Sequence, residues 1–562
     1  MTNWKTKLIL FFLIFFSLLI LWRLYYLQIE KGEYYKALAL GQQIFFKEIK
    51  GERGQVFFRD NKTLLAKTEK KYIVYIFPQK ILPEQKEKTV KILSKILKEK
   101  EKELNSFFEQ GKILKREVSY KTLKEIKSQK LKGVVTETLW GRFYPQKKVG
   151  AHLIGFINTE GKGQYGIEAF YDEILKGAKK INRKEKTYLG YFGSLLQKSD
   201  DFSSLKGATL FLTIDYKLQY FSERLLEKAQ EQWQIDSGQI LIINPQIGEI
   251  LALAIWPSFD PNNYRQEKKL EIFLNPIYQY LFEPGSVLKP ITIAAALEEK
   301  VITPKTTYFD QGYIQIVGQP IFNFNKQNWG ECSINKILNY SINTGIVFVQ
   351  QKLGTEKFLN YLRKFGLFEK TKIDLSGEVF SENKNLIRDS HPRTMATASF
   401  GQGIEITPLQ LIRAFGVIAN DGSLIQPFIV KKIVKSNGEI IETKPKIQKG
   451  IISKEATKIL TQMLIEIIER GSAQRTKIQG YFIAGKTGTA QVPLKDKRGY
   501  SPTETIHSFI AFFPVLEPQF LILIKLDNPK KERISSRTAV PLARELIKYI
   551  IDSWQIPPDY LE

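Results

Sequence analysis

Cysteine, histidine and methionine are the scarcest residues in this 562-residue sequence, with one cysteine, three histidines and three methionines. A single cysteine, Cys332, cannot form an intramolecular disulfide and does not make a cysteine-based metal site. The histidines, His152, His391 and His507, lie far apart, and none belongs to a ligand spacing such as H-E-x-x-H. We therefore expect no metal ion and no other cofactor.

Acidic residues are outnumbered by basic ones, 58 to 84, which gives a formal net charge of +26. Basic runs such as 98–100 and 530–533 are spread along the chain. Dispersed charge of this kind is typical of a solvated surface. Attraction to anionic lipid head groups or wall polymers is the functional alternative. The sequence has no recognisable nucleic-acid-binding module, so we expect no nucleic-acid partner.

Long apolar runs are rare as well, and only the N-terminal segment offers one long enough to span a membrane. Residues 8–22 are apolar apart from Ser17, and beyond Arg23 the apolar character continues to Leu27. A spanning helix needs about 20 residues, a length that the run reaches if Arg23 extends to the interface. A cleaved signal peptide is the alternative, but residues 18–35 contain no small-x-small cleavage site. We therefore expect an uncleaved anchor.

Two lysines before this segment predict its orientation. Lys5 and Lys7 precede the apolar run, and cytoplasmic flanks are enriched in basic residues. The N-terminus should therefore lie in the cytoplasm, and the chain beyond about residue 30 should lie outside.

The rest of the chain predicts an α/β (α+β) protein, with helices packed on a mostly antiparallel sheet. Apolar residues at helical spacing in 84–104 predict an amphipathic surface helix. The polar stretch 178–206 looks like a linker and suggests a domain boundary. Strands are predicted at 208–213, 238–244, 249–255, 482–491 and 508–513, and helices at 286–299 and 333–352.

The most informative segment is FEPGSVLKP at residues 282–290. Pro284 and Gly285 break regular structure, and a helix-compatible run follows, so Ser286 should lie at a helix N-terminus. Spacing i, i+3 places Lys289 one turn further on the same face. A serine hydroxyl needs a nearby base to become a nucleophile, and a buried lysine can be that base. The helix N-terminus also offers N–H groups to a developing oxyanion.

Ser-x-x-Lys alone is a weak signal, because it also occurs at 203–206, 333–336 and 381–384, where a helix cap beside a surface lysine is the ordinary interpretation. Two further elements follow in order. Ser341-x-Asn343 lies within 339–345, and KTGT at 486–489 lies in a predicted strand. Gly488 has no side chain, so a ligand backbone could approach it closely. The three elements together match the serine acyl-transfer set Ser-x-x-Lys, Ser-x-Asn and Lys-Thr-Gly.

With these motifs the chain resembles the class B penicillin-binding proteins, and the resemblance runs almost from end to end. Further segments similar to the boxes of that family are RGQV at 53–56, RDN at 59–61, LLA at 64–66, RFYP at 142–145, HLIG at 152–155, GIE at 166–168, the stretch 244–262, FGQG at 400–403 and TPLQ at 407–410.

The resemblance implies roles for single residues of this chain. Ser286 would be the acylated nucleophile, Lys289 would take its proton, and Ser341 would relay protons. Asn343 would hold the substrate peptide or Lys289. Residues 486–489 would line the cleft, with Lys486, Thr487 and Thr489 binding the substrate's terminal carboxylate and Gly488 beside them. The N–H groups of Ser286 and Thr489 would form the oxyanion hole.

The resemblance also implies an organisation and a setting. We expect a cytoplasmic tip and anchor at 1–30, a pedestal (dimerisation-like) domain at 31–205, a transpeptidase domain with a β-lactamase-like fold at 206–553, and a tail at 554–562. The protein would lie in the bacterial inner membrane. Its partners would be peptidoglycan stem peptides, β-lactams, a glycosyltransferase of the SEDS type and other cell-wall synthesis proteins.

Three classes of function remain open, and the first has two possible roles. The leading class is a monofunctional D,D-transpeptidase. A serine β-lactamase or D,D-carboxypeptidase would use the same motifs but transfer the acyl group to water. A β-lactam sensor or inactive scaffold is the third, although all motif residues are present. A transpeptidase could serve division or elongation. Ser-x-Asn and the segment 151–156 look more like the division type, by analogy alone.

Overall fold

The computed structural model describes residues 3–31, 44–111, 113–177, 179–185, 206–388, 391–494 and 499–560. It divides into two compact units. Unit 1 comprises Met1–Glu52 and Lys176–Gly207, and unit 2 comprises Arg53–Leu175 and Ala208–Glu562.

Unit 1 holds the apolar helix and one strand pair. Helix α1 spans Asn3–Tyr25 and continues as a π-helical turn, η1, over Tyr26–Glu30. Among the described residues, Lys7–Glu30 is the one helical stretch long and apolar enough to cross a membrane, and none of its most apolar window is buried. Strand β1 (Ile44–Lys50) pairs antiparallel with β8 (Lys179–Glu185). The linker expected at 178–206 was therefore wrong for β8, because backbone pairing can order a strand whose side chains are mostly polar.

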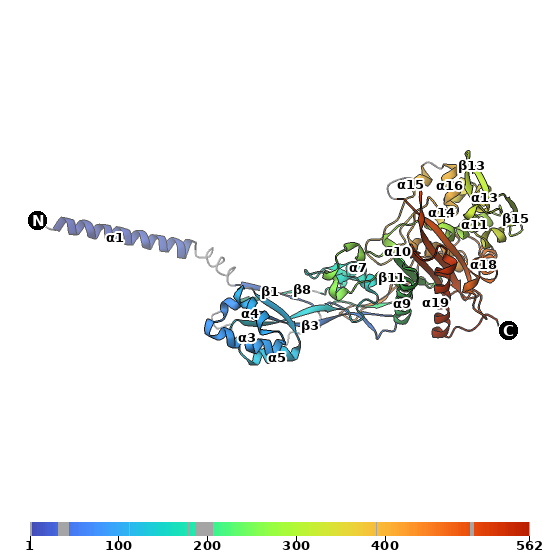
Figure 1. The fold of residues 1–562 in the computed structure, drawn as a ribbon. Coiled ribbons are helices and arrows are strands. Elements are labelled where there is room, and N and C mark those ends of the chain that lie inside the picture. Colours follow the sequence, from blue (N-terminus) through green and yellow to red (C-terminus); the bar gives the residue numbers. More distant parts are fainter. Residues whose placement is uncertain are drawn as a thin grey trace. The chain divides into compact units, whose positions relative to one another are not determined.

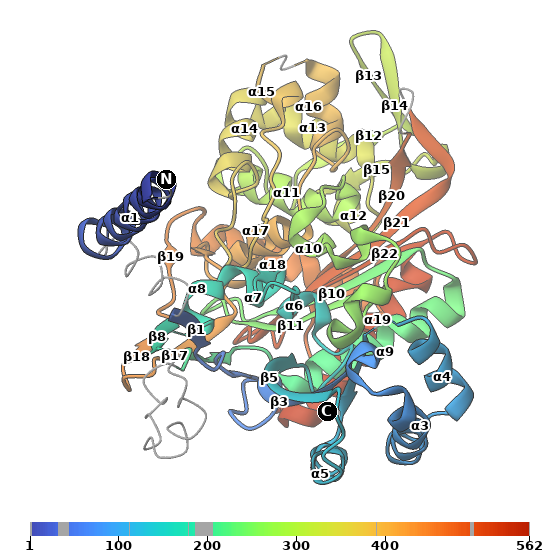
Figure 2. The same ribbon diagram turned by 90° about the vertical axis from the view of Figure 1, so that its left-hand side faces the viewer.

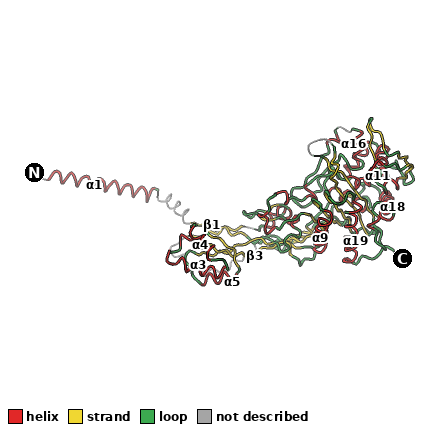
Figure 3. The backbone as a smooth tube through the Cα atoms, viewed as in Figure 1, coloured by secondary structure: helices red, strands yellow, loops and turns green. Residues whose placement is uncertain are grey.

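Unit 2 begins with a small layer of three strands and three helices. Strand β3 (Leu64–Ile76) pairs with β4 (Leu114–Val118) and β5 (Val134–Phe143). Figure 3 shows the helices gathered beside β3. They are α3 (Pro83–Leu97), α4 (Glu101–Glu109) and α5 (Tyr120–Ser128).

The single amphipathic helix expected at 84–104 is two helices in the structure. Helix α3 ends at Leu97, its C-cap residue Lys98 is left-handed with a φ of +57°, and α4 then begins at Glu101. The apolar residues expected on one face still meet, because Val90, Leu93 and Leu104 all lie in the same buried cluster. The sequence thus predicted the face correctly and missed the turn, since lysine carries no turn signal.

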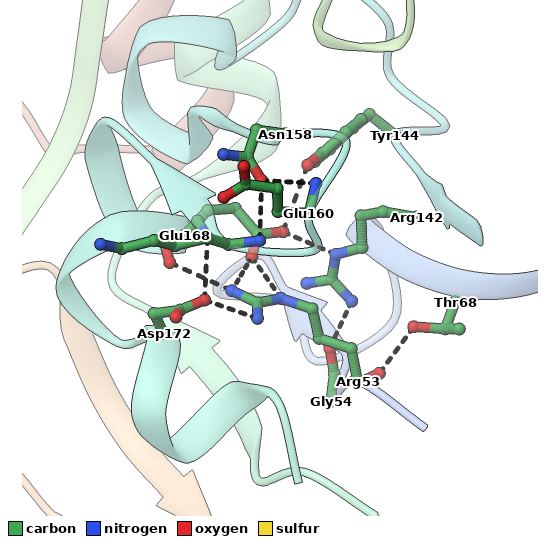
Figure 4. Close-up of polar contacts among 11 residues, drawn as sticks. Arg53, Gly54, Thr68, Arg142, Tyr144, Asn158, Glu160, Glu168 and Asp172 are labelled. Atoms are coloured by element: carbon green, nitrogen blue, oxygen red, sulfur yellow. Dashed lines mark hydrogen bonds and ion pairs between the residues drawn. The ribbon is translucent and has the colours of Figure 1, made fainter. Parts of the chain in front are cut away.

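A buried polar cluster joins three of the segments that resemble family boxes (Figure 4). Glu168 has no exposed side chain, and it accepts hydrogen bonds from Arg53 Nε at 2.7 Å and from Arg142 Nε at 2.6 Å. Arg53 Nη1 also donates to Asp172 Oδ1 at 2.8 Å. The raised pKa of Tyr144 reflects burial and the nearby negative charge of Glu168. Residues of these segments that lie 26 and 115 positions apart in sequence are therefore joined by charge-assisted hydrogen bonds.

The largest sheet of unit 2 is five-stranded and antiparallel, in the order β11-β10-β22-β21-β20. Figure 2 shows α11 and α12 on one side of this sheet, with α9 and α19 on the other. The strands are β10 (Ser237–Ile243), β11 (Ile250–Trp256), β20 (Ala484–Pro493), β21 (Tyr500–Phe513) and β22 (Phe520–Asp527). The helices are α9 (Tyr216–Trp233), α11 (Lys289–Glu298), α12 (Ile334–Asn339) and α19 (Ala539–Trp554). The mostly antiparallel α+β prediction is confirmed.

A second sheet crosses the expected domain boundary within unit 2. Strand β2 (Val56–Phe57) pairs in parallel with β9 (Thr209–Leu212), so residues from both sides of position 205 share one hydrogen-bonded ladder. Figure 1 shows unit 2 continuing from these strands to the sheet and helices of the later chain. The limits 1–30, 31–205, 206–553 and 554–562 remain predictions.

Candidate active site

The turn that carries Ser286 is held by a second backbone segment. A 3₁₀ turn, η7 (Gly285–Leu288), leads directly into α11, and Ser286 is half-buried in its first part. Gly285 has a φ of +63°, and its N–H donates to the carbonyl of Gly401 at 2.9 Å. A Cβ on Gly401 would lie 2.2 Å from the Gly285 oxygen, so only glycine fits there. The FGQG segment at 400–403 therefore packs against the predicted nucleophile.

Lys289, Ser341 and Asn343 meet in one hydrogen-bonded cluster. Lys289 has no exposed surface, and its Nζ contacts the Ser341 carbonyl at 2.5 Å, Ser341 Oγ at 3.0 Å and Asn343 Oδ1 at 2.8 Å. The i, i+3 geometry predicted for Lys289 and the Ser-x-Asn pairing thus place three of the five predicted catalytic side chains in contact.

The predicted helix 333–352 is broken at the residue that this cluster needs. Helix α12 ends at Asn339, and α13 (Asn343–Leu353) begins at Asn343. Between them Ser341 takes a left-handed conformation, with a φ of +57°. Such a conformation is strained for serine and recurs at functional sites. It brings both the carbonyl and the hydroxyl of Ser341 within reach of Lys289.

Burial lowers the pKa values of Lys289 and Lys486 below that of a lysine in water. Desolvation lowers the pKa of Lys289 well below its ordinary value, and the positive charge of Lys486 lowers it further. Burial alone lowers the pKa of Lys486 to about 7. Burial disfavours the charged form of an amine, so Lys289 is suited to accept a proton near neutral pH.

The KTGT segment lies on β20, which is the edge strand of the sheet. Lys486 Nζ is fully buried and donates to the Thr487 carbonyl at 3.1 Å. The Thr487 hydroxyl lies 3.1 Å from Ser472 Oγ, and the Thr489 hydroxyl donates to Ser535 Oγ at 3.1 Å. Thr489 is half-buried, so its hydroxyl is more accessible than the ammonium of Lys486.

Gly488 proves to be needed for packing inside the protein. A Cβ at this position would lie 2.4 Å from Ser508 Oγ and 3.0 Å from Val287 Cγ1. The space beside Gly488, where the sequence predicted a ligand backbone, is thus filled by strand β21 and by the turn after Ser286. Glycine lets β20 lie directly against η7, which fixes the distance between KTGT and the serine.

Ser286 itself stands apart from these contacts. Its Oγ makes no hydrogen bond to Lys289 or to any other part of the chain that the structure describes. Catalytic hydrogen bonds are often long in a free enzyme and tighten when substrate binds. The hydroxyl is therefore free to turn toward a ligand, with Lys289 three residues away at the start of α11.

Sequence reasoning missed Glu283, three residues before the serine. Its carboxylate accepts hydrogen bonds from the Gly403 N–H at 3.0 Å and from the Tyr500 hydroxyl at 3.0 Å. The pKa of Glu283 is raised, chiefly by burial. Glu283 thus connects the serine turn to the 400–403 segment and to β21. Ser472 and Ser535 were missed as well, and no motif in the sequence marks them.

Of the other Ser-x-x-Lys segments, 333–336 begins with a helix cap and 381–384 is a local turn before the short helix α15 (Lys384–Ile387). The Ser333 hydroxyl caps α12 by accepting from the Lys336 N–H at 3.2 Å. The Ser381 hydroxyl accepts from the Asn383 N–H, and Lys384 is exposed. Ser203 lies outside the described residues. Among the described residues no three His, Cys, Asp or Glu side chains gather into a possible metal site.

The fold and the matching family models together define a transpeptidase of the penicillin-binding class. The penicillin-binding protein transpeptidase domain matches residues 238–548, and the penicillin-binding protein dimerisation domain matches residues 48–212. The chain belongs to the class B penicillin-binding proteins.

Several known proteins are similar over nearly the whole chain. Stage V sporulation protein D of Bacillus subtilis is 31% identical and covers 98% of this chain and 86% of its own length. The peptidoglycan D,D-transpeptidase FtsI homolog of Mesostigma viride is also 31% identical, over 98% of this chain and 96% of its own. Penicillin Binding Protein 2X from Streptococcus thermophilus superposes with a TM-score of 0.73 at 21% identity, over 90% of this chain and 80% of its own, and shows the shared fold.

Proposed function

We propose that this chain is a peptidoglycan D,D-transpeptidase that works through an acyl-enzyme on Ser286 and is acylated by β-lactams at the same serine. The observation that carries the proposal is the cluster of Lys289, Ser341 and Asn343 next to the serine turn. Membership of the penicillin-binding protein family and relatives named as D,D-transpeptidases support it.

Acylation begins when Ser286 Oγ attacks the carbonyl carbon of the penultimate D-alanine of a stem peptide. The hydroxyl proton passes to the neutral amine of Lys289, and the carbonyl oxygen becomes an oxyanion that the N–H groups of Ser286 and Thr489 stabilise. The peptide C–N bond then breaks. The leaving D-alanine takes up the proton that Lys289 donates by way of the Ser341 hydroxyl. The acyl group remains bound to Ser286 Oγ as an ester.

Transfer reverses these roles. The amine of a neighbouring stem peptide attacks the ester carbon, loses a proton to Lys289 or Ser341, and the C–O bond to Ser286 breaks. A new amide cross-link forms and the serine hydroxyl is restored. A β-lactamase or carboxypeptidase would bring water to the same ester, so the acceptor distinguishes the functions.

Whether the acyl group passes to an amine or to water can be measured directly. The full chain in detergent is incubated with a stem-peptide mimic ending in D-Ala-D-Ala, with and without an amine acceptor, and the products are weighed by mass spectrometry. We expect released D-alanine to be accompanied mainly by the amide product when the acceptor is present. Exclusive hydrolysis would favour the carboxypeptidase function, and rapid release of a hydrolysed penicillin would favour a β-lactamase.

Lys486 should act on the substrate carboxylate through its charge, because it has no exposed surface of its own. At an effective dielectric constant near 20, a cation about 8 Å from a carboxylate contributes roughly 2 kcal/mol. Lys486→Ala should therefore slow acylation by carboxylate-bearing ligands by about ten- to a hundredfold. A matched thioester whose terminal carboxylate is an amide should lose much less.

The pH dependence of the same comparison gives an internal control. The pKa of Lys486 is lowered to about 7, so the cation is present below that pH and is lost above it. Acylation by the charged ligand should fall above about pH 7 relative to the neutral ligand. Equal slowing of both ligands, at every pH, would mean that Lys486 only supports the strand.

The apolar helix at Lys7–Glu30 fits a single-pass anchor. We propose that it holds the protein in the inner membrane with the N-terminus in the cytoplasm and the catalytic domain outside. Deleting residues 1–30 should leave a protein that stays in solution without detergent and is still labelled by fluorescent penicillin. Retention of the truncated chain in the membrane fraction would reveal a second anchor.

We also propose a role in division, with a SEDS-type glycosyltransferase supplying the glycan strands. Depleting the protein in its own organism should give filaments if it serves division, whereas round cells would indicate elongation.

A further inference from the structure

A buried polar network lies at the start of α13, one residue beyond Asn343. Its centre is Asp310, the last residue of strand β12 (Thr307–Asp310), and this side chain has no exposed surface. Asn323, just after strand β14 (Gln319–Phe322), and Thr344, in the first turn of α13, complete the network and are buried as well. The proposed reaction assigns no role to any of the three.

The described contacts of the Asp310 carboxylate are all with hydrogen-bond donors. Its Oδ1 accepts from the Thr344 hydroxyl at 2.7 Å and from the Gly312 N–H at 3.0 Å. Its Oδ2 accepts from Asn323 Nδ2 at 2.8 Å and from the Trp329 N–H at 2.9 Å. A buried carboxylate is costly unless it is hydrogen-bonded, so these contacts fix its position. Because the donors come from separate places in the chain, Asp310 holds those places together.

Asn323 supplies the cap that α13 lacks within its own sequence. The N-cap residue, Ile342, has no side-chain capping hydrogen bond. Asn323 Oδ1 accepts instead from the Thr344 N–H at 3.1 Å. The first N–H groups of a helix have no partner inside the helix, and a side-chain oxygen that accepts from one of them stabilises the first turn. The negative charge of Asp310 near the same helix end adds to this effect. The start of α13 is therefore fixed from outside the helix.

The network adjoins the cluster around Lys289 through Asn343. The Nδ2 of Asn343 donates to the Phe322 carbonyl at 3.3 Å, so two consecutive residues of α13 contact two consecutive residues of the preceding segment. A carbonyl can only accept, so this contact fixes which way the amide of Asn343 points. Its Oδ1 is left to face Lys289 Nζ, at 2.8 Å.

We propose that Asp310, Asn323 and Thr344 are positioning residues that hold Asn343 against Lys289 and thereby set the rate at which Ser286 is acylated. None of their described contacts is to Lys289 or Ser286, so they act through Asn343. Placement matters at such a site, because a displacement of about 1 Å can lower a rate by about 100-fold. The inference rests on the proposed function, since its effect is measured as acylation.

Thr344→Val tests the network with little change of shape, because valine lacks only the hydroxyl that donates to Asp310. Thr344→Ser is the conservative variant, because it keeps that hydroxyl. The second-order rate constant for labelling by fluorescent penicillin is measured on the full chain in detergent. We expect it to fall at least about fivefold in Thr344→Val and to stay within about twofold of the wild type in Thr344→Ser.

Thr371→Val is a matched control in the same domain. Thr371 is also buried, and its hydroxyl donates to the buried carboxylate of Glu378 at 2.6 Å, in the loop after α14 (Thr355–Lys364). This variant should lower the midpoint of thermal unfolding about as much as Thr344→Val, because each loses one buried hydrogen bond. Its rate constant should nevertheless stay within about twofold of the wild type. Equal losses of rate in the two variants would contradict a positioning role.

A double-mutant cycle with Asn343→Ala separates positioning from general destabilisation. If Thr344 acts through Asn343, Thr344→Val should lower the rate constant by less than about twofold once the Asn343 side chain is gone. The same fold-loss in both backgrounds, or no loss in Thr344→Val alone, overturns the proposal. A wild-type protein that takes no label would instead contradict the proposed function.

Discussion

Replacing Lys289 with arginine is expected to lower the rate of acylation by penicillin by at least about 100-fold, the usual scale for loss of a general base. Arginine keeps the positive charge but cannot lose its proton at usable pH. In the wild type, burial and the charge of Lys486 both lower the pKa of Lys289, so its neutral amine forms more readily than that of a lysine in water. The rate should be measured by stopped-flow or gel fluorescence with a fluorescent penicillin.

A matched control is available in the same domain. Lys336 also stands three residues after a serine, but it donates to the carbonyls of Trp329 and Glu331, away from the cluster around Lys289. Lys336→Arg should leave acylation within about twofold of the wild type, because half-buried Lys336 is outside the cluster and arginine can keep donating to the same carbonyls. Near-normal acylation by Lys289→Arg would remove Lys289 as the base.

Replacing Glu168 with glutamine should lower the free energy of unfolding by about 3–5 kcal/mol, the cost of removing one partner from a buried ion pair. Its carboxylate is fully buried and holds both Arg53 and Arg142. A neutral amide would leave part of two buried guanidinium charges uncompensated. Chemical denaturation, followed by tryptophan fluorescence, measures the change.

The control for this prediction is an exposed ion pair. Glu87 pairs with Lys91 on the surface of α3, and both side chains are mostly exposed. Exposed helix pairs contribute only about 0.3–0.5 kcal/mol, so Glu87→Gln should hardly change stability. Equal, small effects of the two substitutions would mean that the polar cluster around Glu168 does not hold the three chain segments together.

The sequence predicted which side chains meet in the site better than it predicted the turns that bring them together. Short motifs named Ser286, Lys289, Ser341, Asn343 and the KTGT strand, because acyl transfer needs a nucleophile, a base and hydrogen-bond donors of those residue types. Three of these side chains do meet, at Lys289. The break between α12 and α13 was missed, since it depends on a left-handed Ser341 that the tertiary contact with Lys289 supports rather than on a turn residue.

Contacts between distant segments were the other part that the sequence could not give. Glu283 joins Gly403 and Tyr500, which lie 120 and 217 residues away. The glycine at 488 looked like a clearance for ligand, but Ser508 and Val287 fill that space. Both follow from how β20, β21 and η7 pack, and no local pattern encodes the pairing of strands so far apart.

The central claim is that Ser286 becomes the acyl-enzyme, and locating the adduct tests it most directly. The full chain is reacted with benzylpenicillin, digested, and mapped by tandem mass spectrometry, alongside Ser286→Ala and the matched variant Ser333→Ala, which changes the helix-capping serine of α12. We predict one penicilloyl group on Ser286 in the wild type and in Ser333→Ala, and none in Ser286→Ala. An adduct on another residue, or labelling that persists in Ser286→Ala, would contradict the account.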